Sequence, residues 1–119
     1  MKLKGFRDLI VWQKSKALAV KVYRITSSFP KEELFGIVFQ MRKAAVSIPS
    51  NIAEGQARNG KKEFKHFLGI ANGSTAELET QIEISYEMQF LPDATYWELL
   101  NDCAEVGKLL NGLITSLKE

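Results

Sequence analysis

Apolar residues recur every three or four positions along almost the whole chain, which is the spacing of amphipathic α-helices. The pattern is interrupted at three turns, Ser28-Phe29-Pro30, Asn59-Gly60 and Leu91-Pro92-Asp93. It therefore predicts four helices, over residues 8–27, 31–58, 61–90 and 94–118. Asp8 is the expected N-cap of the first helix, and Thr95 with Glu98 has the spacing of a capping box at the fourth.

The connections between these segments are short, and no alternating strand pattern occurs. Short connections force neighbouring helices to run antiparallel, so the pattern predicts a single all-α domain over residues 1–119, an up-down-up-down antiparallel four-helix bundle. Interior glycine costs about 1 kcal/mol relative to alanine, and interior proline about 3 kcal/mol. Pro49 is expected to interrupt the second helix. Compensating contacts are expected at the interior glycines Gly55, Gly69, Gly73, Gly107 and Gly112.

Composition narrows the class of protein. The 119 residues, 45% of them apolar, suit one globular domain with its own core. No apolar run approaches the roughly 18 residues that span a bilayer, and MKLKGFRDL lacks the apolar centre of a secretory signal, so a cytoplasmic protein is expected. The lone Cys103 lies on the apolar stripe of the last helix, which predicts a small buried hydrophobe rather than a reactive thiol.

Charge is distributed unevenly along the chain. Residues 1–65 hold fourteen Lys or Arg against five Asp or Glu, whereas residues 66–119 hold two against nine. In one interpretation the basic and acidic halves attract each other, within the bundle or between subunits. In the other, part of the basic surface stays open for a phosphate backbone.

Basic residues form two candidate nucleic-acid-binding patches. One recurs along the first helix, at Arg7, Lys14, Lys21 and Arg24. The other clusters around the start of the third helix, at Arg58, Lys61, Lys62 and Lys65. No base-reading motif accompanies either patch, so any recognition would be of backbone or shape.

The second helix also carries a mixed polar stripe within QMRKAAVSIPSNIAEGQAR. We interpret this stripe as a polar network or interface that fixes helix register, with Arg42 or Arg58 neutralising the carboxylates. The alternative is a ligand site at Pro49, where freed carbonyls and serine hydroxyls face solvent. The residues of the network are Arg42, Lys43, Ser47, Ser50, Asn51, Glu54 and, from the third helix, Glu77, with Ser74 and Gln81 as further partners.

Catalytic constellations are incomplete. Glu63 and His66 have the Glu-x-x-His spacing by which helical bundles bind paired metal ions, but that site needs two such motifs and His66 is the only histidine. The same shortage argues against histidine-dependent nucleophilic triads. We therefore expect no enzyme activity, no metal and no cofactor.

Three segments carry a resemblance to a known family: FRDLIVWQKSKALAVKVY, ELFGIVFQMRKAAVSIPSNIAEGQAR and FLGIANGSTAELETQIEIS. They resemble the four-helix-bundle proteins named for the 23S rRNA intervening sequence. That family is encoded in insertions within bacterial 23S rRNA genes, and a related branch supplies the accessory protein of diversity-generating retroelements. The resemblance implies a ring-shaped homo-oligomer, a pentamer in the related branch, that handles nucleic acid and works with a reverse transcriptase.

Together, the residues and the resemblance predict a non-enzymatic, oligomeric protein that binds structured RNA or RNA-DNA. The alternative is a protein-interaction scaffold without direct nucleic-acid binding. A third hypothesis is a small-molecule binder at Pro49.

Overall fold

Four α-helices make up most of the chain in the computed structural model, which describes residues 5–117. They are α1 (Ile10–Thr26), α2 (Ile37–Ala57), α3 (Lys61–Glu87) and α4 (Asp93–Ser116). Two short 3-10 helices, η1 (Gly5–Asp8) and η2 (Lys31–Glu33), precede α1 and α2. No strand occurs within the described residues, so the predicted all-α class is confirmed.

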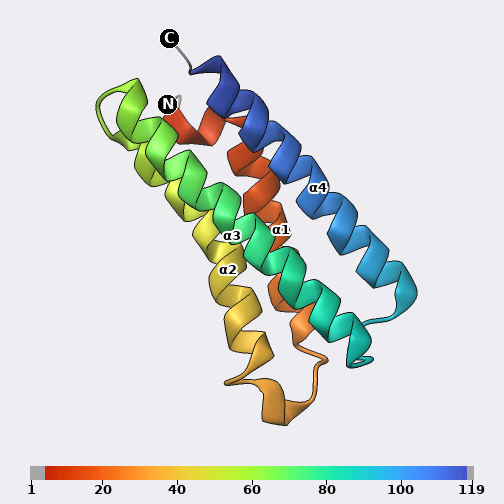
Figure 1. Ribbon diagram of the computed structural model, residues 1–119. Coiled ribbons are helices and arrows are strands. Elements are labelled where there is room, and N and C mark those ends of the chain that lie inside the picture. The colour runs from red at the N-terminus through yellow and green to blue at the C-terminus, as the bar shows by residue number, and fades with distance from the viewer. Residues whose placement is uncertain (1–4, 118–119) are drawn as a thin grey trace.

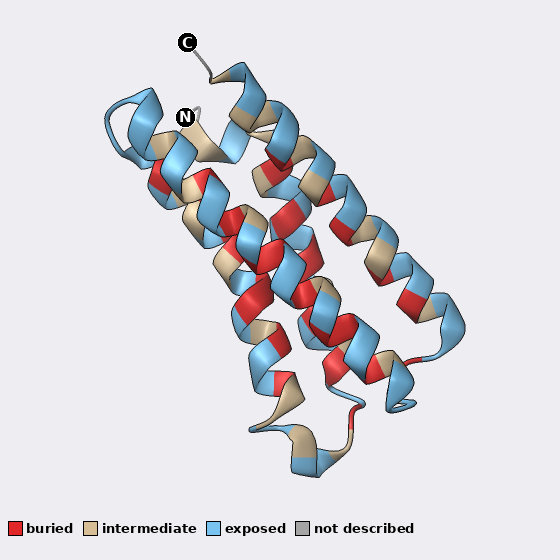
Figure 2. Ribbon diagram, in the orientation of Figure 1, coloured by how far each residue is buried: buried red, intermediate tan, exposed pale blue. Residues whose placement is uncertain are grey.

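Each helix begins at the end of the bundle where the preceding helix stops, so consecutive helices run in opposite directions (Figure 1). Consecutive helices pack side by side, and α1 also packs against α4. Figure 2 shows the buried positions facing inward and the exposed ones facing out on all four helices. The core is built from the predicted apolar stripes, and its fully buried side chains include Val22, Met41, Ile48, Ile52, Leu68, Leu78, Ile82, Leu99 and Leu110.

The segment before α2 differs from its prediction. The expected single helix over 31–58 is wrong, because the chain forms η2 and then leaves helical geometry at Gly36, where ψ is −116°. A Cβ at Gly36 would lie 2.9 Å from Glu33 Oε1. The break leaves Leu34 and Phe35 on the surface, and Phe35 is 90% exposed.

The predicted helix starts are also corrected. The N-cap of α1 is Leu9 rather than Asp8, and the N-cap of α4 is Pro92, ahead of Thr95. Neither cap makes a side-chain hydrogen bond. Pro49 does not interrupt α2, which runs unbroken from Ile37 to Ala57 with Pro49 buried.

Interior glycines behave differently from one another. A Cβ on Gly55 would lie 2.6 Å from Phe67 Cβ, so this glycine lets α2 and α3 approach closely. At the other four, Gly69, Gly73, Gly107 and Gly112, no described atom outside the adjacent residues and backbone of the same helix lies within 4 Å of the Cβ position. The compensating contact expected at the face shared by Gly69 and Gly73 therefore does not come from the described residues, and a contact from a neighbouring subunit stays a prediction.

Candidate nucleic-acid interface at the start of helix α3

Two of the predicted binding lysines on α1 form ion pairs with carboxylates of α4 at the surface of the bundle. Lys21 Nζ lies 2.6 Å from both Glu98 Oε2 and Asp102 Oδ2 on α4. Lys14 Nζ lies 3.4 Å from Glu105 Oε2 on the same helix. The hydrogen bonds to Asp102 and Glu98 raise the pKa of Lys21, because they stabilise its charged form. Some of the basic residues in the first half of the chain therefore pair with acidic residues in the second half, and these pairs join α1 to α4.

The other two cations of the first patch stay on the surface. Arg7, in η1, lies over the Phe6 ring at 4.6 Å from the ring centroid. Arg24 is exposed and lines a groove between α1 and α2. The predicted patch of four cations along α1 is thus divided among different contacts.

Arg58 ends α2 and is largely neutralised. Its guanidinium donates to Glu54 Oε2 at 2.7 Å and lies 3.7 Å from Glu63 Oε2. It also stacks over the Phe67 ring, 5.1 Å from the centroid. This ion pair ties the end of α2 to the start of α3.

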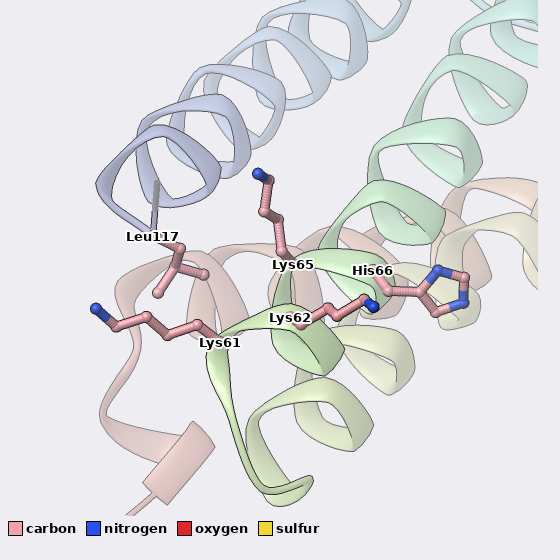
Figure 3. Close-up of a pocket in the computed structure, with 5 residues that line it drawn as sticks. All are labelled: Lys61, Lys62, Lys65, His66 and Leu117. Carbon is pink, nitrogen blue, oxygen red and sulfur yellow. The ribbon is translucent and has the colours of Figure 1, made fainter. Parts of the chain in front are cut away.

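The remaining lysines of the second cluster line a pocket of about 540 Å³ together with His66 and Leu117. In Figure 3, Lys61 and Lys65 extend toward the end of α4, where Leu117 lies, and Lys62 extends toward His66. Lys61, Lys62 and Lys65 make no salt bridge with any carboxylate of residues 5–117. Three cations without a carboxylate partner among residues 5–117 therefore line one concave surface.

The backbone adds to this positive potential. Gly60 precedes α3 in a left-handed conformation, with φ of +108°, and provides no side-chain cap. The first helical hydrogen bond of α3 runs from Phe64 N to Gly60 O, so the amides of the three residues before Phe64 have no intrahelical partner. Free amides and the helix dipole favour an anion at this end of a helix.

The polar stripe of α2 reaches α3 at one point. Ser47 Oγ and Ser74 Oγ lie 2.8 Å apart, and Asn51 Nδ2 donates to Ser47 Oγ at 2.9 Å. Glu54 and Glu77 are exposed, and Arg58 neutralises Glu54 as expected, but neither carboxylate bonds to the facing helix among the described residues. Gln81 is buried, and its Oε1 has no hydrogen-bond partner among the described residues. The stripe supplies a short hydroxyl and amide bridge rather than a buried ionic network.

The remaining stripe residues serve other surfaces. Arg42 donates to Thr26 Oγ1 at 3.0 Å and to the Tyr23 carbonyl at 3.2 Å, so it binds the end of α1 instead of neutralising a carboxylate. Lys43 and Ser50 are exposed. The groove that includes Pro49 is lined mainly by apolar side chains and does not include Ser50.

Other candidate chemistry in the described residues is limited. Cys103 is buried, as predicted, and burial raises the pKa of its thiol to about 12. No group of three or more metal-ligating side chains occurs within residues 5–117. No helix in the same range has the length and apolarity to cross a membrane.

Sequence reasoning missed two features near the site. Leu117 closes the lysine pocket from the opposite end of the sequence, and only the antiparallel packing of α3 and α4 brings it there. The exposed aromatic rings beside Arg42 were also missed, because Phe35 and Phe39 fit an apolar helix pattern. The signal in the sequence was that these two aromatic residues lie close together and outside the stripe of α2 that faces the core.

Comparison with known proteins agrees with the fold. The model of the family described as 23S rRNA-intervening sequence protein matches residues 7–112. No curated protein matches the chain. Among solved structures, the chain is similar to a Bacteroides thetaiotaomicron protein of unknown function from the S23 ribosomal protein family, with a TM-score of 0.80 and 26% identity. That alignment covers 89% of this chain and 96% of the other.

Proposed function

Because the chain belongs to the 23S rRNA-intervening sequence protein family, we propose that it binds structured RNA or an RNA-DNA hybrid, as an oligomer and without catalysis. The contact surface is the lysine pocket, which we define as Lys61, Lys62, Lys65 and His66 with Leu117. The observation that carries the proposal is that the three lysines have no carboxylate partner among residues 5–117, in contrast to Lys14 and Lys21.

Recognition through this pocket is of backbone rather than sequence. Lysine ammonium groups and the free amides at the start of α3 suit phosphate oxygens, which are shared by every nucleotide. A pocket open to solvent between two helix ends admits a bent or looped backbone more readily than a base edge. We therefore expect affinity to vary with nucleic-acid shape and to depend little on sequence.

The proposed assembly is a homo-oligomer. Two further parts of the proposal come from the family resemblance: that the oligomer is a pentameric ring, and that its partner is a reverse transcriptase. Repetition of the lysine pocket around several subunits would multiply single weak contacts when one nucleic acid reaches more than one pocket. Flanking genes test the proposed partner, since a neighbouring reverse transcriptase gene or an enclosing rRNA gene would favour the corresponding setting.

Fluorescence anisotropy across a salt series tests the binding site. Structured RNA, a matched RNA-DNA hybrid and duplex DNA are titrated with the wild-type protein and with the Lys61→Gln/Lys65→Gln variant. Each lost phosphate contact reduces the slope of log affinity against log salt by about 1, so the variant should show a slope shallower by about 2. Its affinity should fall to a similar extent for every sequence of the same shape.

A variant with the same loss of charge provides the control. Lys31 and Lys108 are exposed and lie away from the lysine pocket, so Lys31→Gln/Lys108→Gln should retain the wild-type slope. Equal losses in both variants would mean that net charge alone drives binding. Absence of wild-type binding at low salt would overturn the proposal.

A protein-interaction scaffold is the second candidate. Exposed apolar residues on and just before α2, including Phe39 and Phe35, favour it, because such side chains commonly mark protein contacts. Loss of RNA affinity with an unchanged oligomeric mass in Lys61→Gln/Lys65→Gln supports nucleic-acid binding. Dissociation of the oligomer in that variant would support the scaffold.

A further inference from the structure

A continuous apolar surface lies outside the bundle along α1 and α2. Two adjoining grooves, of about 510 and 370 Å³, share Tyr23 and Val46 in their walls. We call this surface the α1-α2 groove. Its principal apolar residues are Val20, Tyr23, Phe35, Phe39, Val46 and Pro49.

Cations surround this groove. Lys16, Arg24 and Lys43 line it, and none of them forms a salt bridge with a carboxylate of residues 5–117. Arg42 also lines it and is bonded only to a hydroxyl and a backbone carbonyl. A partner that matches this surface needs an apolar stripe that also carries a carboxylate.

The outer face of α3 has that chemistry. Ile70, Glu77 and Ile84 follow one another at steps of seven residues, so they lie along one line of the helix, and all three are exposed. Met88 extends the line at 57% exposure. Glu77 forms no salt bridge among the described residues.

A glycine makes this face accessible to another helix pair. At Gly73, between Ile70 and Glu77, no described atom outside the adjacent residues and backbone of α3 lies within 4 Å of the Cβ position. A neighbouring surface can therefore approach the α3 backbone closely there. We call Ile70, Gly73, Glu77, Ile84 and Met88 the α3 stripe.

We infer that the α1-α2 groove of one copy binds the α3 stripe of a second copy of this chain. The groove and the stripe share no residue, so the contact is head-to-tail and each copy uses both surfaces once. Apolar burial supplies the attraction, and the cations around the groove pair with the stripe carboxylate. The inference rests on the proposed oligomer and names the surfaces that build it.

A mixing experiment with two variants tests this arrangement. Val46→Asp places a charge inside the groove, and Ile84→Asp places one on the stripe. Each variant alone lacks one of the two surfaces on every copy, so each should sediment as a monomer of 13.4 kDa. In an equimolar mixture the intact groove of Ile84→Asp meets the intact stripe of Val46→Asp. The mixture should form dimers of twice that mass and grow no further.

Several results would overturn the inference. A monomeric wild-type protein, or variants that keep the wild-type mass, would remove the interface from these surfaces. Monomeric variants whose mixture stays monomeric would mean that the contact is not head-to-tail. Ala104 is exposed on α4, outside both surfaces, so Ala104→Asp should keep the wild-type mass.

Folding and RNA binding are measured on the same samples. Circular dichroism checks the helical content of each variant, and Lys43→Glu replaces Val46→Asp if that variant unfolds. The lysine pocket is intact in the monomeric variants, so they should still bind RNA with lower avidity. Wild-type assembly without RNA binding would refute the proposed nucleic-acid binding and leave the interface standing. RNA binding by a monomeric wild-type protein would refute the interface and the proposed oligomer and leave nucleic-acid binding standing.

Discussion

Replacement of Gly55 by alanine is expected to destabilise the protein even though alanine is the better helix former. Alanine in an interior helical position gains about 1 kcal/mol over glycine. At Gly55 its new Cβ would lie 2.6 Å from Phe67 Cβ, 3.2 Å from Phe64 Cδ1 and 3.3 Å from the Phe64 carbonyl oxygen. Phe67 Cβ and the carbonyl are fixed to the α3 backbone, so rotamer changes cannot relieve these contacts.

The size of the effect follows from the required movement. Carbon atoms pack best at about 3.5–4.0 Å, so α2 and α3 must separate locally by about 1 Å. Overpacking of this kind typically costs 1–3 kcal/mol or more, and here it is expected to exceed the gain in helix propensity and leave a net loss of about 1–2 kcal/mol. With an unfolding entropy of about 2.1 cal/mol/K per residue, Tm should fall by about 4–8 °C.

The assay is thermal and urea unfolding followed by circular dichroism, at one protein concentration for all variants because an oligomer's stability depends on concentration. Gly112→Ala is the matched control, since Gly112 is exposed on α4 and no described atom outside the adjacent residues and backbone of α4 lies within 4 Å of its Cβ position. It should gain about 0.5–1 kcal/mol. If Gly55→Ala is as stable as Gly112→Ala, the close packing of α2 on α3 is not as described.

Two further substitutions test the polar contacts of α1. Arg42→Lys keeps the charge but loses the planar guanidinium that donates to the Tyr23 carbonyl and stacks on the Tyr23 ring. Urea unfolding should therefore show a free energy of unfolding lower by about 1–2 kcal/mol. Equal stability of the variant and the wild type would contradict this role. Lys21→Met tests the link to α4 through its pH dependence. Since Asp102 and Glu98 raise the pKa of Lys21, its stabilisation is fully present below the unfolded pKa of 10.5 and is lost as the pH rises through the higher folded pKa. The difference in Tm between wild type and Lys21→Met should therefore be constant from neutral pH to about pH 9 and should shrink above pH 10.5. A difference in Tm that persists at higher pH would refute the ionic contribution.

Much of the fold could be predicted because the apolar period is nearly uninterrupted. Leu99, Cys103, Val106 and Leu110 follow the predicted stripe of α4, and all four are buried. The break before α2 escaped prediction because apolar residues on both sides of Gly36 continue the helical spacing. Periodicity reports which positions suit a helix, whereas the departure at Gly36 depends on its own backbone and on nearby Glu33.

The candidate site was predictable only in part, because the partner of a charge is a tertiary property. Lys14 and Lys21 look no different in the sequence from Lys61 and Lys65, as all are lysines on amphipathic helices. Packing of α1 against α4 brings carboxylates to the first pair. Lys61, Lys62 and Lys65 at the start of α3 receive none from the described residues, and the apolar pattern of the sequence could not distinguish them from the first pair.

The ion pairs between α1 and α4 confirm one of the two interpretations of the uneven charge, and the binding of a phosphate backbone stays a prediction. Attraction between α1 and α4 accounts for Lys14 and Lys21, whereas the lysine pocket and the α1-α2 groove hold cations without a carboxylate partner among residues 5–117. These two surfaces suit different partners. The cations of the α1-α2 groove surround apolar side chains, whereas the lysine pocket lies beside the free backbone amides at the start of α3. Apolar burial is insensitive to salt at moderate concentration, whereas phosphate contacts weaken steeply with it. A rise in salt should therefore release nucleic acid before it dissociates the subunits, and the order of those two events separates the two uses of positive charge.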